Sequence, residues 1–220
     1  MLTILTSGSF WFSVLASTTP VMLATIAANI LTKSGVFNLG IEGTMLICAL
    51  SGVLVSAYTS SLFFGALFGV LMGILISFML GYFTLILNAP MNACGVAINL
   101  LASGGTVFVL ATLTGSKVTS AALKSLTFPT IHIPFIRDIP FLGPILSGHP
   151  PLTYLAFLTI LVMSVLMYRT KFGVHLRVVG ENEDAAISLG LNTARYKTIA
   201  ILLGSLCCAF AGINLSLERM

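Results

Sequence analysis

The feature that most constrains this chain is the length of its uncharged runs. No Asp, Glu, Lys or Arg occurs from Gly43 to Ser116, and three further stretches are equally free of charge, residues 1–32, 139–168 and 198–217. A water-soluble domain carries about 25% charged residues, whereas this chain of 220 residues carries 7%. A helix of about 20 apolar residues crosses the hydrocarbon core of a bilayer. The runs therefore predict an integral membrane protein.

The apolar segments are expected to be helical. Strand edges with unpaired backbone groups do not survive in lipid, and the alternating pattern of a β-barrel strand is absent from the sequence. We therefore predict an all-α fold, a polytopic transmembrane helix bundle that forms a single domain over residues 1–220. About six spans are expected, near residues 10–31, 42–58, 62–87, 91–114, 152–168 and 197–217.

Small residues recur at every fourth position of the third expected span. Such a row predicts a groove along one helix face, where a neighbouring backbone can approach closely. A plain enrichment of glycine in membrane helices is the alternative explanation. The candidate helix-packing residues are Gly65, Gly69, Gly73 and Gly81, with Ser77 completing the row.

Two polar segments interrupt the apolar spans. Residues 115–151 hold six of the eight prolines, and residues 169–197 hold five of the ten Lys and Arg residues. Because Lys and Arg accumulate in cytoplasmic loops, residues 169–197 are expected in the cytoplasm. Counting spans outward from there makes residues 115–151 an external loop, and it places Lys33 inside and the N-terminus outside.

The cytoplasmic segment contains signals for a short helix. The helix is expected from about Glu183 to Leu189, with Asn182 as its N-cap and an acidic first turn that opposes the helix dipole. Gly190 is the expected C-terminal stop. Gly180 tolerates a positive φ and is expected to end the element before this helix.

The short helix also carries a shallow apolar face at helical spacing, formed by Ala185, Ala186 and Leu189. A face of this kind, on a helix between two spans, suits insertion into a cleft on a partner protein. The alternative is a basic connector that is merely solvated.

The order and spacing of this segment resemble a known family. The motifs Arg169-Thr-x-x-Gly173, Arg177-x-x-Gly180-Glu181-Asn182, Ala185-Ala186 and a following Gly190 are similar to the cytoplasmic coupling loop of ABC-importer permeases that carry branched-chain amino acids, simple sugars and nucleosides. Two further blocks resemble the same family, Asn38-x-Gly40-x-Glu42-Gly43 and the stretch from Gly95 to Ala102. The resemblance assigns ATPase coupling to Gly173, Arg177, Gly180, Glu181, Asn182, Ala185, Ala186 and Gly190.

The resemblance implies a type II ABC-importer permease subunit that carries a nucleoside or a simple sugar across a bacterial cell membrane. The sequence agrees in lacking the Gly-x-x-x-x-Gly-Lys-Ser/Thr phosphate loop of an ATPase. The implied partners are a cytoplasmic ABC ATPase, which binds ATP and Mg²⁺, a second permease subunit of the same or a related kind, an external substrate-binding lipoprotein and the lipid bilayer. No catalytic residue, metal, cofactor or nucleic acid is expected on this chain.

Polar side chains inside or beside the spans are candidates for a translocation path, because such groups usually face a cavity or a partner. They are Asn38, Glu42, Asn92, Asn99 and Ser103. Asn38 and Glu42 would share a face if their segment is helical. An interfacial helix start for Glu42, and hydrogen bonds between helices for the amides, are the alternatives.

Three alternative functions for the whole chain follow from the sequence. A membrane enzyme is disfavoured because its metal-binding and nucleophile motifs are absent. An ion-coupled secondary transporter would show more ionisable groups within its spans. Family members continue for several helices after the coupling loop, so a non-functional truncated permease remnant is a further alternative.

Overall fold

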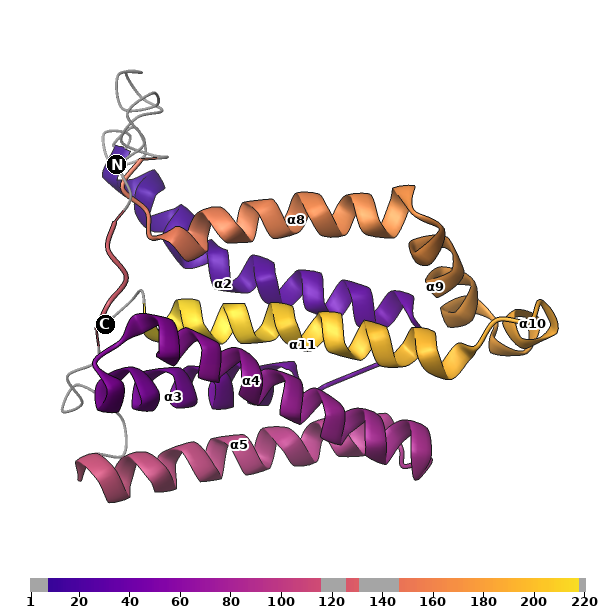
Figure 1. Ribbon diagram of the computed structural model, residues 1–220, viewed down its shortest axis with the longest axis horizontal. Coiled ribbons are helices and arrows are strands. Elements are labelled where there is room, and N and C mark those ends of the chain that lie inside the picture. Colours follow the sequence, from indigo (N-terminus) through magenta and orange to yellow (C-terminus); the bar gives the residue numbers. More distant parts are fainter. Residues whose placement is uncertain (1–7, 116–125, 131–146, 218–220) are drawn as a thin grey trace.

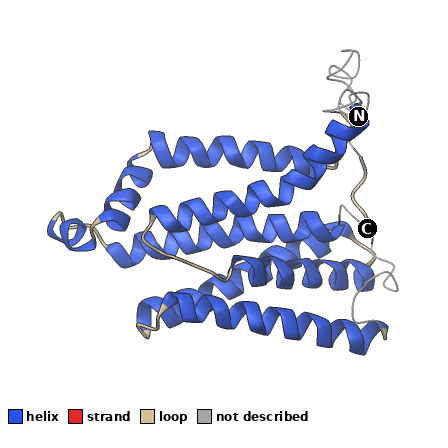
Figure 2. Ribbon diagram, turned by 180° about the vertical axis from the view of Figure 1, so that it is seen from behind, coloured by secondary structure: helices blue, strands red, loops and turns tan. Residues whose placement is uncertain are grey.

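The computed structural model describes residues 8–115, 126–130 and 147–217, and every regular element in these ranges is helical (Figure 2). In chain order the helices are α2 (Gly8–Lys33), α3 (Ile41–Thr59), α4 (Leu62–Gly81), the π-helical turn η1 (Tyr82–Ile86), α5 (Met91–Thr114), α8 (Pro151–Arg169), α9 (Lys171–Glu181), α10 (Glu183–Ser188) and α11 (Thr193–Leu217). Six of them are long and apolar enough to cross a membrane, namely α2, α3, α4 with η1, α5, α8 and α11. The predicted all-α bundle with six spans is confirmed.

Helix α11 lies at the centre of the bundle and contacts α2, α3 and α4 along its length (Figure 1). Its small residues allow this close approach. Gly204 lies against Leu31 of α2, and Gly212 lies against the backbone carbonyl of Met45 in α3. A larger side chain at either position would separate α11 from its neighbours.

The small residues of α4 lie at its contacts with α3 and α11. A Cβ atom built on Gly65 would lie 2.8 Å from the carbonyl oxygen of Gly52 in α3. A Cβ atom built on Gly73 would lie 2.9 Å from Cβ of Ala209 in α11.

The row of small residues does not pack uniformly. Gly69 is close to Ile213, whereas a Cβ atom on Gly81 would meet only Cδ1 of Ile201, at the ordinary distance of 3.9 Å. Gly81 instead borders a cavity of about 110 Å³. The tight part of the α4 interface is therefore the part that contains Gly65, Gly69 and Gly73.

Helices α5 and α8 form the two edges of the bundle (Figure 1). Helix α5 packs mainly on α3, and α8 packs mainly on α2 and α9. Both helices expose large apolar side chains, among them Leu100 and Phe108 on α5 and Leu158 and Leu161 on α8. In a membrane these faces are available to lipid or to another membrane helix.

Helices α9 and α10 lie together at one end of the bundle, the same end at which α2 finishes at Lys33 (Figure 1). At the opposite end, the N–H of Phe128 donates to the carbonyl of Leu217 at 3.1 Å, and the ring of His149 stacks on Phe12 with centroids 4.0 Å apart. Residues 115–151 begin and end at this opposite end, although most of that segment lies outside the described residues.

Candidate functional site

The segment between α8 and α11 folds as two short capped helices. The hydroxyl oxygen of Thr170 accepts the N–H of Gly173 at 3.3 Å and begins α9. The side chain of Asn182 accepts the N–H of Ala185 at 3.0 Å and begins α10. Gly190 follows α10 with a φ of 77°. The N-cap and the glycine stop that the sequence predicts are both present.

Gly180 lies in the last turn of α9, which ends one residue later at Glu181, and its φ is not positive. The expectation that Gly180 itself ends the element is therefore wrong. A Cβ atom on Gly180 would meet the carbonyl oxygen of Lys33 and would lie 2.7 Å from the nitrogen of Gly35. Gly173, earlier in α9, lies similarly close to the carbonyls of Leu166 and Met167. Glycine is needed at both positions because backbone from neighbouring segments occupies the space of a side chain.

The expected apolar face of α10 is divided between two directions. Ala186 is fully buried and holds α10 against the body of the protein. Ala185 is exposed, and Leu189 exposes 71% of its surface. Ile187 is also exposed. The exposed apolar side chains are therefore Ala185 and Leu189, one helical turn apart, and Ile187 on another side of α10. We refer to these three residues as the α10 surface.

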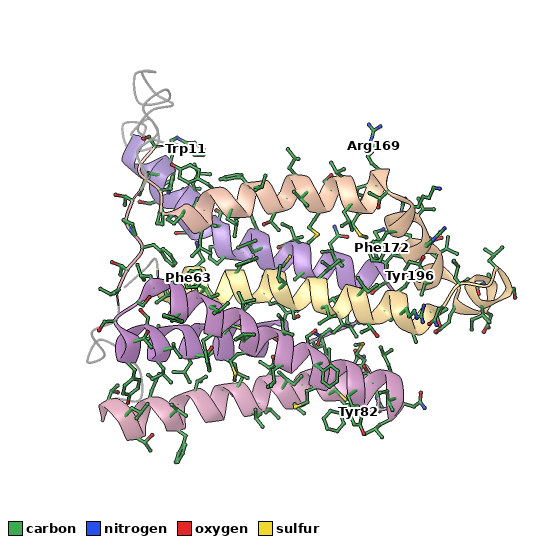
Figure 3. All side chains as sticks on the ribbon, viewed as in Figure 1. Trp11, Phe63, Tyr82, Arg169, Phe172 and Tyr196 are labelled. Atoms are coloured by element: carbon green, nitrogen blue, oxygen red, sulfur yellow. The ribbon has the colours of Figure 1, made fainter. Side chains whose placement is uncertain are left out.

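Helices α9 and α10 are attached to the first turns of α11. Lys197 donates to the carboxylate of Glu183 at 2.6 Å, which joins α10 to α11. The rings of Phe172 and Tyr196 stack with centroids 5.6 Å apart, so α9 also contacts α11 (Figure 3). His175 Nδ1 lies 2.8 Å from the hydroxyl oxygen of Tyr196. A displacement of α10 would therefore be passed directly to the central helix.

The Glu183 carboxylate is predicted to make the anchoring of α10 sensitive to acid. Its hydrogen bond from Lys197 lowers its pKa, so the stabilisation is fully present above the usual glutamate pKa and is lost as the pH falls through the lowered value. Because Glu183 is half exposed, the contribution is below about 1 kcal/mol. At neutral pH, Glu183→Gln should speed amide hydrogen exchange in α10 by less than about fivefold, and the two proteins should converge in acid. Glu181→Gln is the matched control, and an equal effect there would contradict the assignment.

A second set of contacts holds the non-helical residues 34–40 between α2 and α3. The amide of Asn99 on α5 donates from Nδ2 to the carbonyl of Leu39 at 2.8 Å, and its Oδ1 accepts the N–H of Gly43 at 2.7 Å. Asn38 Oδ1 accepts the N–H of Gly40 at 2.7 Å. These side chains satisfy backbone groups that no helix satisfies, which lipid would otherwise leave unpaired.

The candidate path residues therefore have different environments. Asn38 and Glu42 do not share a helix face, because α3 begins only at Ile41. Glu42 is exposed in the first turn of α3, and Ser103 is exposed on α5. Asn92 is exposed in the first turn of α5, directly after the non-helical residues 87–90 that connect two spans at the α10 end. Of the five residues, Glu42, Asn92 and Ser103 have exposed side chains, although the hydroxyl of Ser103 donates to the carbonyl of Leu100 at 3.1 Å.

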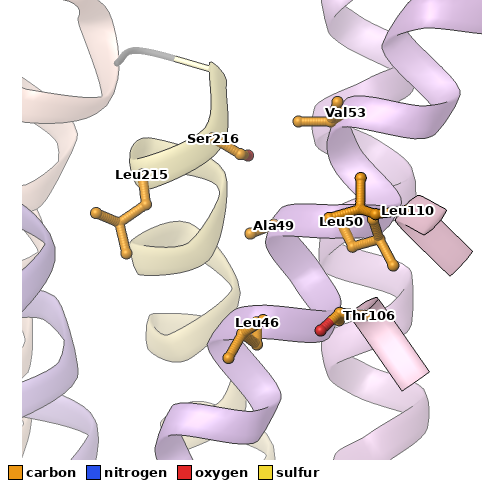
Figure 4. A pocket seen from close by; sticks show the side chains of 8 residues that line it. All are labelled: Leu46, Ala49, Leu50, Val53, Thr106, Leu110, Leu215 and Ser216. Atoms are coloured by element: carbon orange, nitrogen blue, oxygen red, sulfur yellow. The ribbon is translucent and has the colours of Figure 1, made fainter. Parts of the chain in front are cut away.

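A groove between α3 and α5 begins about one helical turn after Glu42 and Ser103, at Leu46 and Thr106, and neither Glu42 nor Ser103 lines it. Residues spaced three or four apart share a helix face, so Leu46 and Val53 continue from Glu42, and Thr106 continues from Ser103. The groove contains a cavity of about 230 Å³ that reaches the last turn of α11 (Figure 4). It is lined by Leu46, Ala49, Leu50, Val53, Thr106, Leu110, Leu215 and Ser216. We refer to it as the α3–α5 groove.

No group of three His, Cys, Asp or Glu side chains suited to a metal ion occurs among the described residues. The buried cysteines Cys48, Cys207 and Cys208 are free thiols.

Comparison with known proteins identifies the family. Residues 10–219 match the family described as the branched-chain amino acid transport system / permease component. The chain belongs to this family. The resemblance read from the sequence motifs is thereby confirmed, and the permease is a multi-pass membrane protein by its family and its six apolar spans. No solved structure is a significant match to the chain.

Several curated relatives match most of the permease. The guanosine ABC transporter permease protein NupQ of Bacillus subtilis is 29% identical over 203 residues, covering 89% of this chain and 62% of the relative. The nucleoside ABC transporter permease protein NupC of Lactococcus lactis is 28% identical over 211 residues, covering 91% of this chain and 64% of the relative. The glucose ABC transporter permease protein TsgB13 of Haloferax volcanii is 28% identical over 224 residues, covering 95% of this chain and 57% of the relative. The chain thus spans roughly three fifths of the length of these relatives.

Proposed function

We propose that the chain is a permease subunit of an ATP-driven importer and that α10 docks a separate cytoplasmic ABC ATPase. The observation that carries the proposal is the α10 surface, which exposes Ala185, Ile187 and Leu189 on a capped helix beyond the spans (Figure 1). Exposed apolar side chains clustered on one element mark interaction sites. The relatives, which are named as ABC transporter permeases, support the same assignment.

The basic residues around α9 and α10 support a cytoplasmic position for this end of the bundle. The coupling residues of the sequence motif then have different tasks. Asn182 and Gly190 set the ends of α10, whereas Gly173 and Gly180 allow α9 to pack on the spans. ATP and Mg²⁺ would bind the partner ATPase, and its closure would move α10 together with the attached α11 as a rigid body.

The cargo that fits best is a nucleoside or a simple sugar. The relatives are named for guanosine, nucleosides and glucose. The α3–α5 groove is our candidate for part of the path, with Thr106 and Ser216 as the polar residues of its lining. Glu42, Asn92 and Ser103 are our candidate path residues outside that lining. The groove's cavity of about 230 Å³ is smaller than the roughly 300–1,000 Å³ of a small-molecule site. A second permease subunit would complete the path, and an external binding lipoprotein in a bacterial cell membrane would deliver the cargo.

The alternative of an ion-coupled carrier has less support. Within the described spans Glu42 is the only carboxylate, and it is exposed in the first turn of α3. Ion-coupled carriers use ionisable groups that are held inside the membrane. A docking helix would also have no task in such a carrier.

The test is co-purification of the permease with its ATPase in detergent. Leu189→Glu places a charge on the α10 surface without touching the buried side of α10, and we expect it to abolish retention of the ATPase. Leu189→Met keeps an apolar side chain at the same position and should retain the ATPase as the wild type does. Ala186 is unsuitable for this test because Ala186→Glu would bury a charge and unfold α10 itself.

Both Leu189 variants should leave the thermal unfolding of the permease unchanged, which separates loss of docking from loss of folding. If Leu189→Glu retained the ATPase and supported substrate uptake, α10 would not be the docking helix.

A further inference from the structure

A groove between α2 and α8 opens at the α10 end of the bundle and belongs neither to the α10 surface nor to the α3–α5 groove. It encloses about 180 Å³. Its mouth is formed by Lys33 at the end of α2, Tyr168 near the end of α8 and Arg177 on α9. Two cations from different helices therefore converge on one opening.

Neither cation forms an ion pair among the described residues, and the acid nearest to Arg177 in the sequence, Glu181, is exposed one helical turn further along α9. The one ion pair among the described residues joins Lys197 to Glu183, and no acidic residue lines the groove. Lys33 is exposed at the end of its helix. The mouth is thus suited to an anion that the described chain does not itself supply.

The guanidinium of Arg177 is held in place at this mouth. Its carbon lies 5.3 Å from the centroid of the Tyr168 ring, and Nε donates to the carbonyl of Gly173 at 3.4 Å. A guanidinium carries five N–H donors in a planar fork, so the remaining donors are free to bind the oxygens of a phosphate group. Tyrosine is also a residue that prefers the headgroup level of a bilayer.

Below the mouth the groove becomes mostly apolar. The apolar residues of its walls are Ile26 and Ile30 of α2 and Ile160, Met163 and Met167 of α8, and the two polar residues among them are Asn29 and Ser164. Ile26 precedes Lys33 by two helical turns, which places it about 10 Å deeper along α2. The cations therefore lie at the ends of membrane helices, and the apolar walls lie at the depth of the acyl chains.

This arrangement selects one kind of ligand. A free phosphate ion would use the cations but not the apolar walls, and an acidic side chain of a partner protein cannot reach down between two membrane helices. An anionic phospholipid uses both, and basic pockets between membrane helices on the cytoplasmic side bind such headgroups. We propose that the groove between α2 and α8 binds an anionic phospholipid, with its phosphate at Lys33 and Arg177 and an acyl chain between Ile26 and Met163.

The test measures lipid bound to the full chain, purified with its partner subunits, by native mass spectrometry. Dioleoyl phosphatidylglycerol should be retained in preference to dioleoyl phosphatidylcholine. Arg177→Gln and Lys33→Gln should each weaken phosphatidylglycerol binding about fivefold. Arg169→Gln is the matched control, because Arg169 lies at the same end of the bundle but its side chain points away from it (Figure 3). This variant should leave lipid binding unchanged.

Ser164→Phe tests the apolar half of the groove without changing any charge. Ser164 is exposed, so the variant should fold normally while its ring fills the groove and displaces the lipid. The assignment would be overturned by equal binding of the two lipids, or by an equal loss with Arg169→Gln. Competition by inorganic phosphate together with an unaffected Ser164→Phe would reveal a free-anion site instead. Unchanged lipid binding in Arg177→Gln, with loss of the ATPase, would reveal a protein interface.

Discussion

Replacing Gly73 by leucine is expected to destabilise the bundle by more than about 2 kcal/mol, because overpacking a tight core costs about 1–3 kcal/mol and the neighbours here cannot move away. A Cβ atom at this position would already lie 2.9 Å from Ala209 Cβ and 3.3 Å from the carbonyl oxygen of Ser205. Both belong to α11, which is enclosed by other helices. The measurement is the thermal unfolding midpoint of the purified permease in detergent, which should fall by several degrees.

Gly81→Leu is the control for Gly73→Leu on the same helix and in the same row of small residues. Its Cβ has room, and the cavity of about 110 Å³ beside it can accept part of the leucine side chain. We expect its unfolding midpoint to stay close to that of the wild type. Equal destabilisation by the two variants would show that the cost comes from helix composition and not from the contact with α11.

Replacing Asn99 by leucine is expected to loosen the junction of α2, α3 and α5. The variant leaves the carbonyl of Leu39 and the N–H of Gly43 without the partners that Asn99 provides. The bond to Gly43 is partly buried and the bond to Leu39 is exposed. An unsatisfied buried polar group costs about 1–3 kcal/mol, so we expect a loss of about 1–3 kcal/mol, mainly from the N–H of Gly43. Hydrogen exchange should accelerate at residues 39–43 before it does so in α11.

Asn92→Leu is the matched control, because Asn92 lies on the same helix, is exposed and makes no hydrogen bond among the described residues. Asn92→Leu should leave the stability of the protein nearly unchanged. Because Asn92 is a candidate path residue, uptake by this variant is measured separately. If Asn99→Leu reduced uptake but left stability and exchange unchanged, Asn99 would line the path rather than hold the backbone of residues 34–40.

The sequence predicted the spans well because span length is a local property. An apolar run either reaches across a bilayer or does not, and the helix ends observed lie within a few residues of those expected. The caps of α10 were equally predictable from the sequence, since Asn182 and Gly190 act on residues next to them in the chain. Such features need no knowledge of tertiary contacts.

The errors arose where distant segments meet. Glycine is a residue type that often ends helices, which is why Gly180 was expected to do so. Its actual role is to leave room for the carbonyl of Lys33. Ala185 and Ala186 are identical in sequence terms, and only the packing against the body of the protein decides which one is buried. The two bonds of Asn99 span 60 and 56 positions of the chain, and no local pattern names those partners. The groove between α2 and α8 was missed for the same reason.

The same two bonds have a consequence for how the protein is made. The carbonyl of Leu39 and the N–H of Gly43 leave the ribosome before Asn99, so these two groups are without their partner when α2 and α3 first enter the membrane. Lipid cannot supply hydrogen bonds. We therefore expect α2 and α3 to remain incompletely packed at first, with residues 34–40 in contact with water. The start of α3 would then reach its final packing in the membrane only after α5 has been synthesised.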